Sequence, residues 1–398
     1  MVNRGVHELF SFHSNNPAIN HQKQLKTMGA TKDPAADLAL LETTVRATLD
    51  LITRLIDTDV NADPSINNDV NAIDLAHDTA SLIRAHSTKI SLLIINKPFT
   101  PSAITKVLRE LVAGPIPGLA SSVELCNAAR YTKTMSSELQ WRVKKLFKEL
   151  IVFVKVIPLD GKVLSEDAKN GGGKTEGKGS LASTGVVWQA CDGVIELKKI
   201  GIAGLLGKLA EEQRELIEDA LWELQEWGEL GSDADEDDDE NSGEEDDAQA
   251  ALDNMFEAQK HIPTADPEEI RPRFETATKQ LKLVILMYKA VVKRRFKTLP
   301  PLPYATKPAN PTDAENENKD IIATVDAVLE ALKKIPEDTD ELASAFYSLK
   351  PTEIDEAMKE CFSTSHKVVD LLLKNWQGQE DEFTTWVRIT TTSVMRIR

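Results

Sequence analysis

The chain has 398 residues, a net charge of −17, and 41% hydrophobic and 28% charged residues, so it is long enough for two domains and apolar enough to fill both cores. The lack of a basic excess argues against direct nucleic-acid binding, which depends on displacing counterions from phosphates. No run of 18 apolar residues and no apolar signal core after Met1 occur, so we expect neither a membrane protein nor a secreted one.

Cysteine usage and composition favour an intracellular helical protein. Cys126, Cys191 and Cys361 are far apart and never share a C-x-x-C motif, so neither a disulfide framework nor a zinc site is predicted. Aromatic residues make up only 5% of the chain, whereas the helix formers Leu, Ala, Lys and Glu are plentiful. Composition therefore predicts an all-α protein in a reducing compartment.

The first part of the chain is predicted to be a helical bundle. Residues 1–33 show no sustained periodicity and are predicted to be a flexible N-terminal extension. Asp33 and Pro34 then give a cap followed by a proline at the first helical position, and apolar residues recur at spacings of three and four as far as Ile56. Similar signals predict helices over about 70–95, 100–113, 117–157 with a break near 132–136, and 184–197. Residues 34–199 are therefore predicted to form an N-terminal antiparallel bundle.

The segment 159–179 is rich in glycine and charge and is predicted to be a mobile loop. Within it, the run GGGKT at 171–175 is similar to part of a phosphate-binding loop. That motif needs another glycine where this chain has Ala168, and it needs a helix to start directly afterwards, whereas Glu176 and further glycines follow. Nucleotide binding is therefore not expected.

A second bundle is predicted over residues 200–381. Its helices are expected at about 202–227, 247–261, 267–297, 319–335, 338–349 and 352–376, with a Pro-rich loop at 299–311 and a C-terminal tail at 382–398. Residues 232–247 hold eleven acidic residues and no basic one, which leaves a net charge of −6 for the rest of the chain. Such a block repels itself, so we predict a disordered acidic insertion.

The helix at 202–227 carries an apolar stripe that includes Leu205, Leu209, Leu216 and Leu224. The stripe is too short and too interrupted by glycine for a sustained coiled coil, so packing in the core is favoured over a partner-binding zipper. The carboxylates at 211–219 are interpreted as a solvated face rather than as an acid-base pair.

Two charged clusters are candidate binding segments. The acidic run Asp235, Glu236, Asp237, Asp238, Asp239 and Glu240 is either a partner-binding segment that captures basic chains or a solubilising loop. The basic cluster Lys293, Arg294, Arg295 and Lys297 is either a nuclear-import signal or a set of cations that complement the end of a helix dipole.

No pattern marks a catalytic or metal centre. The seven histidines are scattered singly, and none lies in an H-E-x-x-H spacing. No G-x-S-x-G occurs, and no serine or cysteine has the setting of a nucleophile. We therefore predict no enzyme activity, no catalytic residue, no metal and no cofactor.

One region carries a family resemblance. Residues 184–192 read TGVVWQACD, and residues 217–224 read IEDALWEL ahead of the acidic block. Together they resemble the cyclin-D-binding protein (GCIP) family, in which a T-G-x-V-W-x-A-C-[DE] helix start precedes a second helix and an acidic region. The motif residues are Thr184, Gly185, Trp188, Ala190, Cys191 and Asp192, and a looser likeness covers the helical order from about Leu38 to Leu373.

The resemblance implies an all-helical, non-enzymatic regulator found in nucleus and cytoplasm. Its implied partners are D-type cyclins and helix-loop-helix transcription factors, and its implied effect is to restrain cell-cycle progression. We therefore expect an all-α protein of two antiparallel bundles, with four to five helices each, that binds proteins but neither nucleic acid nor membrane. The alternative is a vinculin-like helical-bundle scaffold or adaptor at the cytoskeleton, because long antiparallel bundles also resemble those modules.

Overall fold

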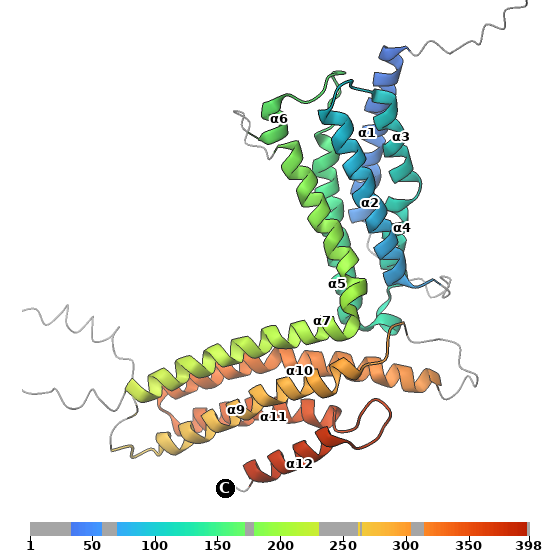
Figure 1. Ribbon diagram of the computed structural model, residues 1–398. Helices are drawn as coiled ribbons and strands as arrows, with labels where there is room; N and C mark the ends of the chain where they lie inside the picture. Colours follow the sequence, from blue (N-terminus) through green and yellow to red (C-terminus); the bar gives the residue numbers. More distant parts are fainter. Residues whose placement is uncertain are drawn as a thin grey trace, which may run out of the picture.

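The computed structural model describes residues 33–57, 70–171, 179–230, 262, 265–303 and 314–395. All regular structure in these residues is helical, which confirms the all-α prediction. Figure 1 shows two groups of helices that are joined by one long helix, α7. The predicted extension up to residue 32 and the predicted acidic insertion at 232–247 lie outside the described residues.

The first group of helices corresponds to the N-terminal part of the chain. It contains α1 (Pro34–Asp57), α2 (Ala72–Ile95), α3 (Pro101–Ala113), α4 (Pro115–Leu125), α5 (Ala128–Lys155) and the first arm of α7 (Ser180–Leu230). Helix α2 packs against α3, α4 and α7, and α5 packs against α1, α4 and α7. Prolines begin α1, α3 and α4 because the first turn of a helix leaves its amides unpaired in any case. The break predicted near 132–136 is confirmed by the non-helical residue Thr132 in α5, but the segment predicted at 117–157 has a further interruption, between α4 and α5, that was not predicted.

The predicted loop at 159–179 contains a short helix, α6 (Glu166–Asn170), that the sequence did not predict. The Ser165 hydroxyl caps it by accepting the Ala168 amide, and Gly171 ends it in the left-handed conformation with φ of 81°. Residues 172–178, with most of the GGGKT run, lie outside the described residues.

Helix α7 links the two groups and bends between them (Figure 1). Its backbone leaves the helical conformation at Gly201, where φ is 59°, a value that glycine adopts at little steric cost. The helices predicted at 184–197 and 202–227 are therefore the two arms of α7. The predicted domain boundary at 199/200 lies beside this bend, and independent folding of the two groups stays a prediction.

The second group contains the second arm of α7, α9 (Ile270–Arg294), the 3-10 turn η1 (Phe296–Thr298), α10 (Ala314–Ser348), α11 (Pro351–Leu371) and α12 (Glu382–Met395). Helix α10 packs against α7 and α11, and α9 packs against α7, α11 and α12. The predicted tail at 382–398 thus contains a helix, and its Phe383 and Val387 are buried. The helix predicted at 247–261 falls outside the described residues.

The predicted break between 335 and 338 was wrong, because α10 runs through Pro336 without interruption. Proline has no amide hydrogen, so the carbonyl four residues earlier, that of Leu332, loses its usual helical partner. The Tyr288 hydroxyl on α9 donates to this carbonyl at 2.6 Å and replaces the missing bond. A contact between helices therefore makes the interior proline tolerable.

Besides sharing α7, the two groups touch where α5 meets α10. The backbone at Thr132 has φ of 69°, which interrupts α5 and frees the amide of Lys133. The carboxylate of Asp326 on α10 accepts this amide at 3.1 Å, so a residue of the second group caps a helix of the first. Buried apolar side chains of both groups belong to one connected core.

Candidate functional site

The residues of the GCIP-type motif lie at the start of α7 and contact α2. The Thr184 hydroxyl bonds to the Ser180 carbonyl at 2.7 Å and to the Ser91 hydroxyl of α2 at 2.9 Å. Ala190 and Cys191 are buried. This part of the motif is therefore a helix-helix contact rather than an open site.

The exposed edge of the motif makes a second set of contacts with α2. The Trp188 indole donates to the Thr88 hydroxyl at 3.0 Å, and the Arg84 guanidinium lies 5.3 Å from the centre of the Trp188 ring. Arg84 also pairs with Asp192 at 2.9 Å. These contacts give the motif a structural role, which is to fasten α7 to α2. Nothing in the structure explains glycine at position 185, where a Cβ would meet no atom within 4 Å.

The three cysteines of the described residues are buried, and these residues contain no cluster of metal-binding side chains. Cys126, Cys191 and Cys361 are buried, and burial raises the pKa of each thiol to about 12. Within these residues no three His, Cys, Asp or Glu side chains gather where they could hold a metal ion. No helix of the described chain has the length and apolarity that crossing a membrane requires.

The second arm of α7 exposes the carboxylates that were predicted to form a solvated face, together with two apolar side chains that the sequence analysis did not place there. We define the acidic α7 face as Glu212, Glu215, Leu216, Asp219, Trp222 and Glu226. Trp222 is 63% exposed and Leu216 is 53% exposed. Glu215, Asp219 and Glu226 form no ion pair with any described residue, although Arg214 and Lys289 are paired nearby. The face combines free negative charge with accessible apolar area.

The position of Leu216 corrects the predicted apolar stripe. Leu205 and Leu224 are buried as expected, but Leu216 points to solvent because the next residue, Ile217, takes the core position and is fully buried. Residues 235–240, the predicted partner-binding run, lie outside the described residues, and they follow the acidic α7 face closely along the chain.

The predicted basic cluster is divided by the structure. Arg295 is fully buried, and its guanidinium donates to the two carboxylate oxygens of Asp381 at 2.7 and 2.9 Å and to the Leu372 carbonyl at 2.8 Å. Arg295 therefore does not belong to a candidate import signal, because its charge is engaged inside the protein. Lys293, Arg294 and Lys297 are exposed, and Arg294 pairs with Glu382 of α12.

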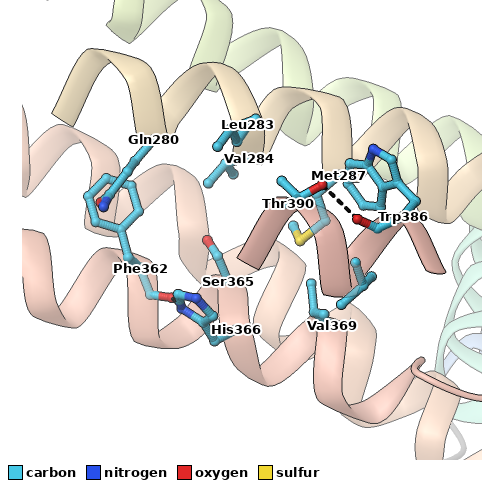
Figure 2. A pocket seen from close by; sticks show the side chains of 11 residues that line it. Gln280, Leu283, Val284, Met287, Phe362, Ser365, His366, Val369, Trp386 and Thr390 are labelled. Carbon is cyan, nitrogen blue, oxygen red and sulfur yellow. Dashed lines mark hydrogen bonds between the residues drawn. The ribbon is translucent and has the colours of Figure 1, made fainter. Parts of the chain in front are cut away.

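An apolar groove lies between α9, α11 and α12 (Figure 2). It is lined by Gln280, Leu283, Val284, Met287, Phe362, Ser365, His366, Val369, Trp386, Val387 and Thr390. Several of its polar groups are already bonded. Nδ1 of His366 bonds to the Phe362 carbonyl at 2.5 Å, and the Thr390 hydroxyl bonds to the Trp386 carbonyl at 2.8 Å. The groove is therefore a largely apolar hollow on the surface.

Comparison with known proteins confirms the resemblance. Residues 76–230 match the family model described as "Grap2 and cyclin-D-interacting, N-terminal", and the matched region includes both the motif and the acidic α7 face. An uncharacterized protein of Schizosaccharomyces pombe is 26% identical over 229 residues, which cover 56% of this chain and 62% of the relative. The match thus spans less than two thirds of that relative's length. No solved structure matches the chain.

Proposed function

From the Grap2 and cyclin-D-interacting domain at residues 76–230, we propose that the protein is a non-enzymatic regulator that binds a cyclin-type or helix-loop-helix partner. The observation that carries the proposal is the acidic α7 face inside this domain. Trp222 and Leu216 are exposed there beside Glu215, Asp219 and Glu226, which form no ion pair with any described residue. Large apolar side chains held at the surface in this way are typical of interaction sites.

The chemistry of the acidic α7 face favours a basic amphipathic helix as its partner. Lysine or arginine side chains would neutralise Glu215, Asp219 and Glu226, and apolar side chains would cover Trp222 and Leu216. The acidic run at 235–240 would add long-range attraction, because a concentrated negative field raises the rate of encounter with a basic partner.

The proposed cellular effect is sequestration of a cell-cycle or transcription factor, which restrains cell-cycle progression. Such an effect requires no chemistry on the partner. Action in nucleus and cytoplasm belongs to the same proposal, with the exposed Lys293, Arg294 and Lys297 as the candidate import residues. Fluorescence microscopy of the protein with these three residues changed to alanine tests that part.

The test of partner binding is calorimetric titration of the purified chain with a D-type cyclin and with a helix-loop-helix domain. We expect binding by at least one of them. The triple variant Glu215→Lys, Asp219→Lys and Trp222→Ala should weaken it at least about tenfold, because two negative charges are reversed and an anchor side chain is lost. The matched control is Glu337→Lys with Glu341→Lys, two exposed residues on α10 with the same spacing.

Two outcomes would overturn the proposal. One is that neither partner gives a heat of binding in the titration. The other is that the α7 variant and the α10 control weaken binding of the partner equally. If neither partner gives a heat of binding and the wild-type chain cosediments with filamentous actin, the vinculin-like scaffold is favoured instead.

A further inference from the structure

Helix α5 presents an exposed surface of the opposite sign. We define the basic α5 face as Trp141, Lys145, Lys148, Val152 and Lys155, which recur at spacings of three and four and so share one side of the helix. Trp141 is 59% exposed and Val152 is 51% exposed. The Lys145 ammonium lies 5.3 Å from the centre of the Trp141 ring.

In an isolated molecule the basic α5 face has two unfavourable features, unpaired like charges and apolar area in water. Lys145, Lys148 and Lys155 form no ion pair with any described residue, and like charges one turn apart on a helix repel each other. An exposed tryptophan and valine in the same row keep apolar area in water. A partner that supplies carboxylates and apolar side chains would reduce the repulsion between the lysines and would cover the exposed apolar area.

The chain itself carries a surface with these properties. The acidic α7 face offers carboxylates in a row with Leu216 and Trp222 beside them. From Trp141 to Lys155 and from Glu212 to Glu226 the two faces cover equal stretches of helix, each about 21 Å long at 1.5 Å per residue. Both faces are exposed within one molecule, so they do not cover each other there.

We propose that the basic α5 face of one copy binds the acidic α7 face of a second copy. The contact is heterologous, because it joins two different surfaces, so each added copy leaves one face of each kind open. The assembly is therefore an open chain or a closed ring, and the smallest ring is a dimer in which each copy binds the other through both faces.

The pattern of the basic α5 face favours a second copy over other anionic partners. A nucleic acid or an anionic membrane offers phosphates to the lysines of α5, but it offers no row of carboxylates and apolar side chains at helical spacing to meet them together with Trp141 and Val152. A second copy brings its carboxylates in a row that fits one helix face. Its lysines, in turn, attract the next copy.

The test is sedimentation velocity of the purified full chain over a range of concentrations at two ionic strengths. At about 0.01 M salt, where the Debye length is about 30 Å, we expect the mean mass to rise with concentration. At about 1 M salt, where it is about 3 Å, we expect monomers. No partner protein is present, so the result is independent of the proposed cyclin-type function.

Charge reversal identifies the two faces. Variant one is Lys145→Glu with Lys148→Glu, and variant two is Glu215→Lys with Asp219→Lys. Each alone should weaken self-association at least about tenfold, because like charges then face each other. Mixed in equal amounts, the two variants should associate again, because each supplies the face that the other lacks. The matched control for the lysines is Lys106→Glu with Arg109→Glu on α3, and circular dichroism checks that each variant is folded.

Three results would overturn the proposal. They are a wild-type chain that stays monomeric at low salt, self-association that survives either charge reversal, and a mixture of the two variants that remains monomeric. A further result would assign the α5 face to another partner. In that case the wild-type chain stays monomeric but binds RNA or vesicles of anionic lipid at low salt, and variant one no longer binds them.

Discussion

Arg295 and Asp381 form a two-pronged ion pair, at 2.7 and 2.9 Å, that fastens α12 to the end of α9. The same guanidinium lies 4.4 Å from the centre of the Phe383 ring, and Asp381 accepts the amides of Phe383 and Thr384 where α12 begins. The Trp376 indole donates to the Arg295 carbonyl at 2.8 Å. This pair therefore sets both the start of α12 and its position beside the apolar groove.

Removal of the Asp381 carboxylate should destabilise the protein strongly. In Asp381→Ala the Arg295 guanidinium stays buried without its counterion, and breaking a buried pair in this way typically costs about 3–5 kcal/mol. We expect the lower end of that range, because Asp381 keeps 32% of its side chain exposed. Urea unfolding measures the change. The control Glu380→Ala removes an exposed pair with Arg388 and should leave the free energy of unfolding nearly unchanged. Equal effects of the two variants would contradict the anchoring role of Asp381.

The same carboxylate predicts a loss of stability in acid. The hydrogen bonds from Arg295 hold the pKa of Asp381 at about 2, below its ordinary 3.8, so the folded protein binds this proton less readily than the unfolded chain. The resulting stabilisation is fully present above about pH 4 and is lost as the pH falls from there through about 2. Urea unfolding at several pH values should show that the free energy of unfolding falls less steeply with acid in Asp381→Asn than in the wild type. An unchanged slope would mean that other groups govern the acid response.

The sequence predicts helix starts better than it predicts helix continuity. Pro34 and Pro101 mark true starts, because the conformation they need is local to the first turn. Pro336 predicts a break that does not occur, because its compensation comes from Tyr288, which is distant in sequence. Helix α12 was missed for the same reason, since its anchor Arg295 lies 86 residues before Asp381.

Tyr288→Phe should reveal how much the continuity of α10 depends on one hydroxyl. The change leaves the buried Leu332 carbonyl without a donor, and an unsatisfied buried acceptor costs about 1–3 kcal/mol. Thermal or urea unfolding measures this loss. Tyr347→Phe is the matched control, because Tyr347 is 40% exposed and water can replace its hydroxyl contacts. A Tyr288→Phe protein as stable as the control would show that Leu332 finds another donor.

The candidate site could be predicted only in part. Residues 184–192 lie inside the region that matches the family model, but their contacts with Arg84, Thr88 and Ser91 depend on which face of α2 meets α7. The carboxylates of the acidic α7 face were predicted to be solvated, but its apolar part was missed because Leu216 was assigned to the buried stripe. Ile217, Leu221 and Leu224 form the actual stripe, and spacing measured from Ile217 would have placed Leu216 and Trp222 outside it.

Substitution within the motif should reduce stability and leave partner binding unchanged. Trp188→Phe keeps most of the ring but loses the indole donor to Thr88 and weakens the stacking of Arg84, so we expect a loss of about 1 kcal/mol. Urea unfolding and titration with a D-type cyclin measure the two properties. Trp222→Phe is the control with the opposite expectation, since Trp222 is 63% exposed: stability unchanged and binding weaker. A Trp188→Phe variant that folds normally but no longer binds would place the motif in the binding site instead.

Asp326 should control the angle between the two groups of helices. Its carboxylate caps the interrupted part of α5 at Lys133, and alanine at a capping position typically costs about 1 kcal/mol. Because Asp326 belongs to α10, the lost cap should also widen the range of orientations about the bend at Gly201. Spin labels at Lys106→Cys on α3 and Glu356→Cys on α11 measure that range, since the three native thiols are buried. Asp326→Ala should broaden the distance distribution, whereas Asp326→Asn, which retains an oxygen acceptor, should keep it narrow. If Asp326→Ala leaves the distribution narrow, the packing around α7 is sufficient to hold the two groups and the cap serves only the local start of a helix.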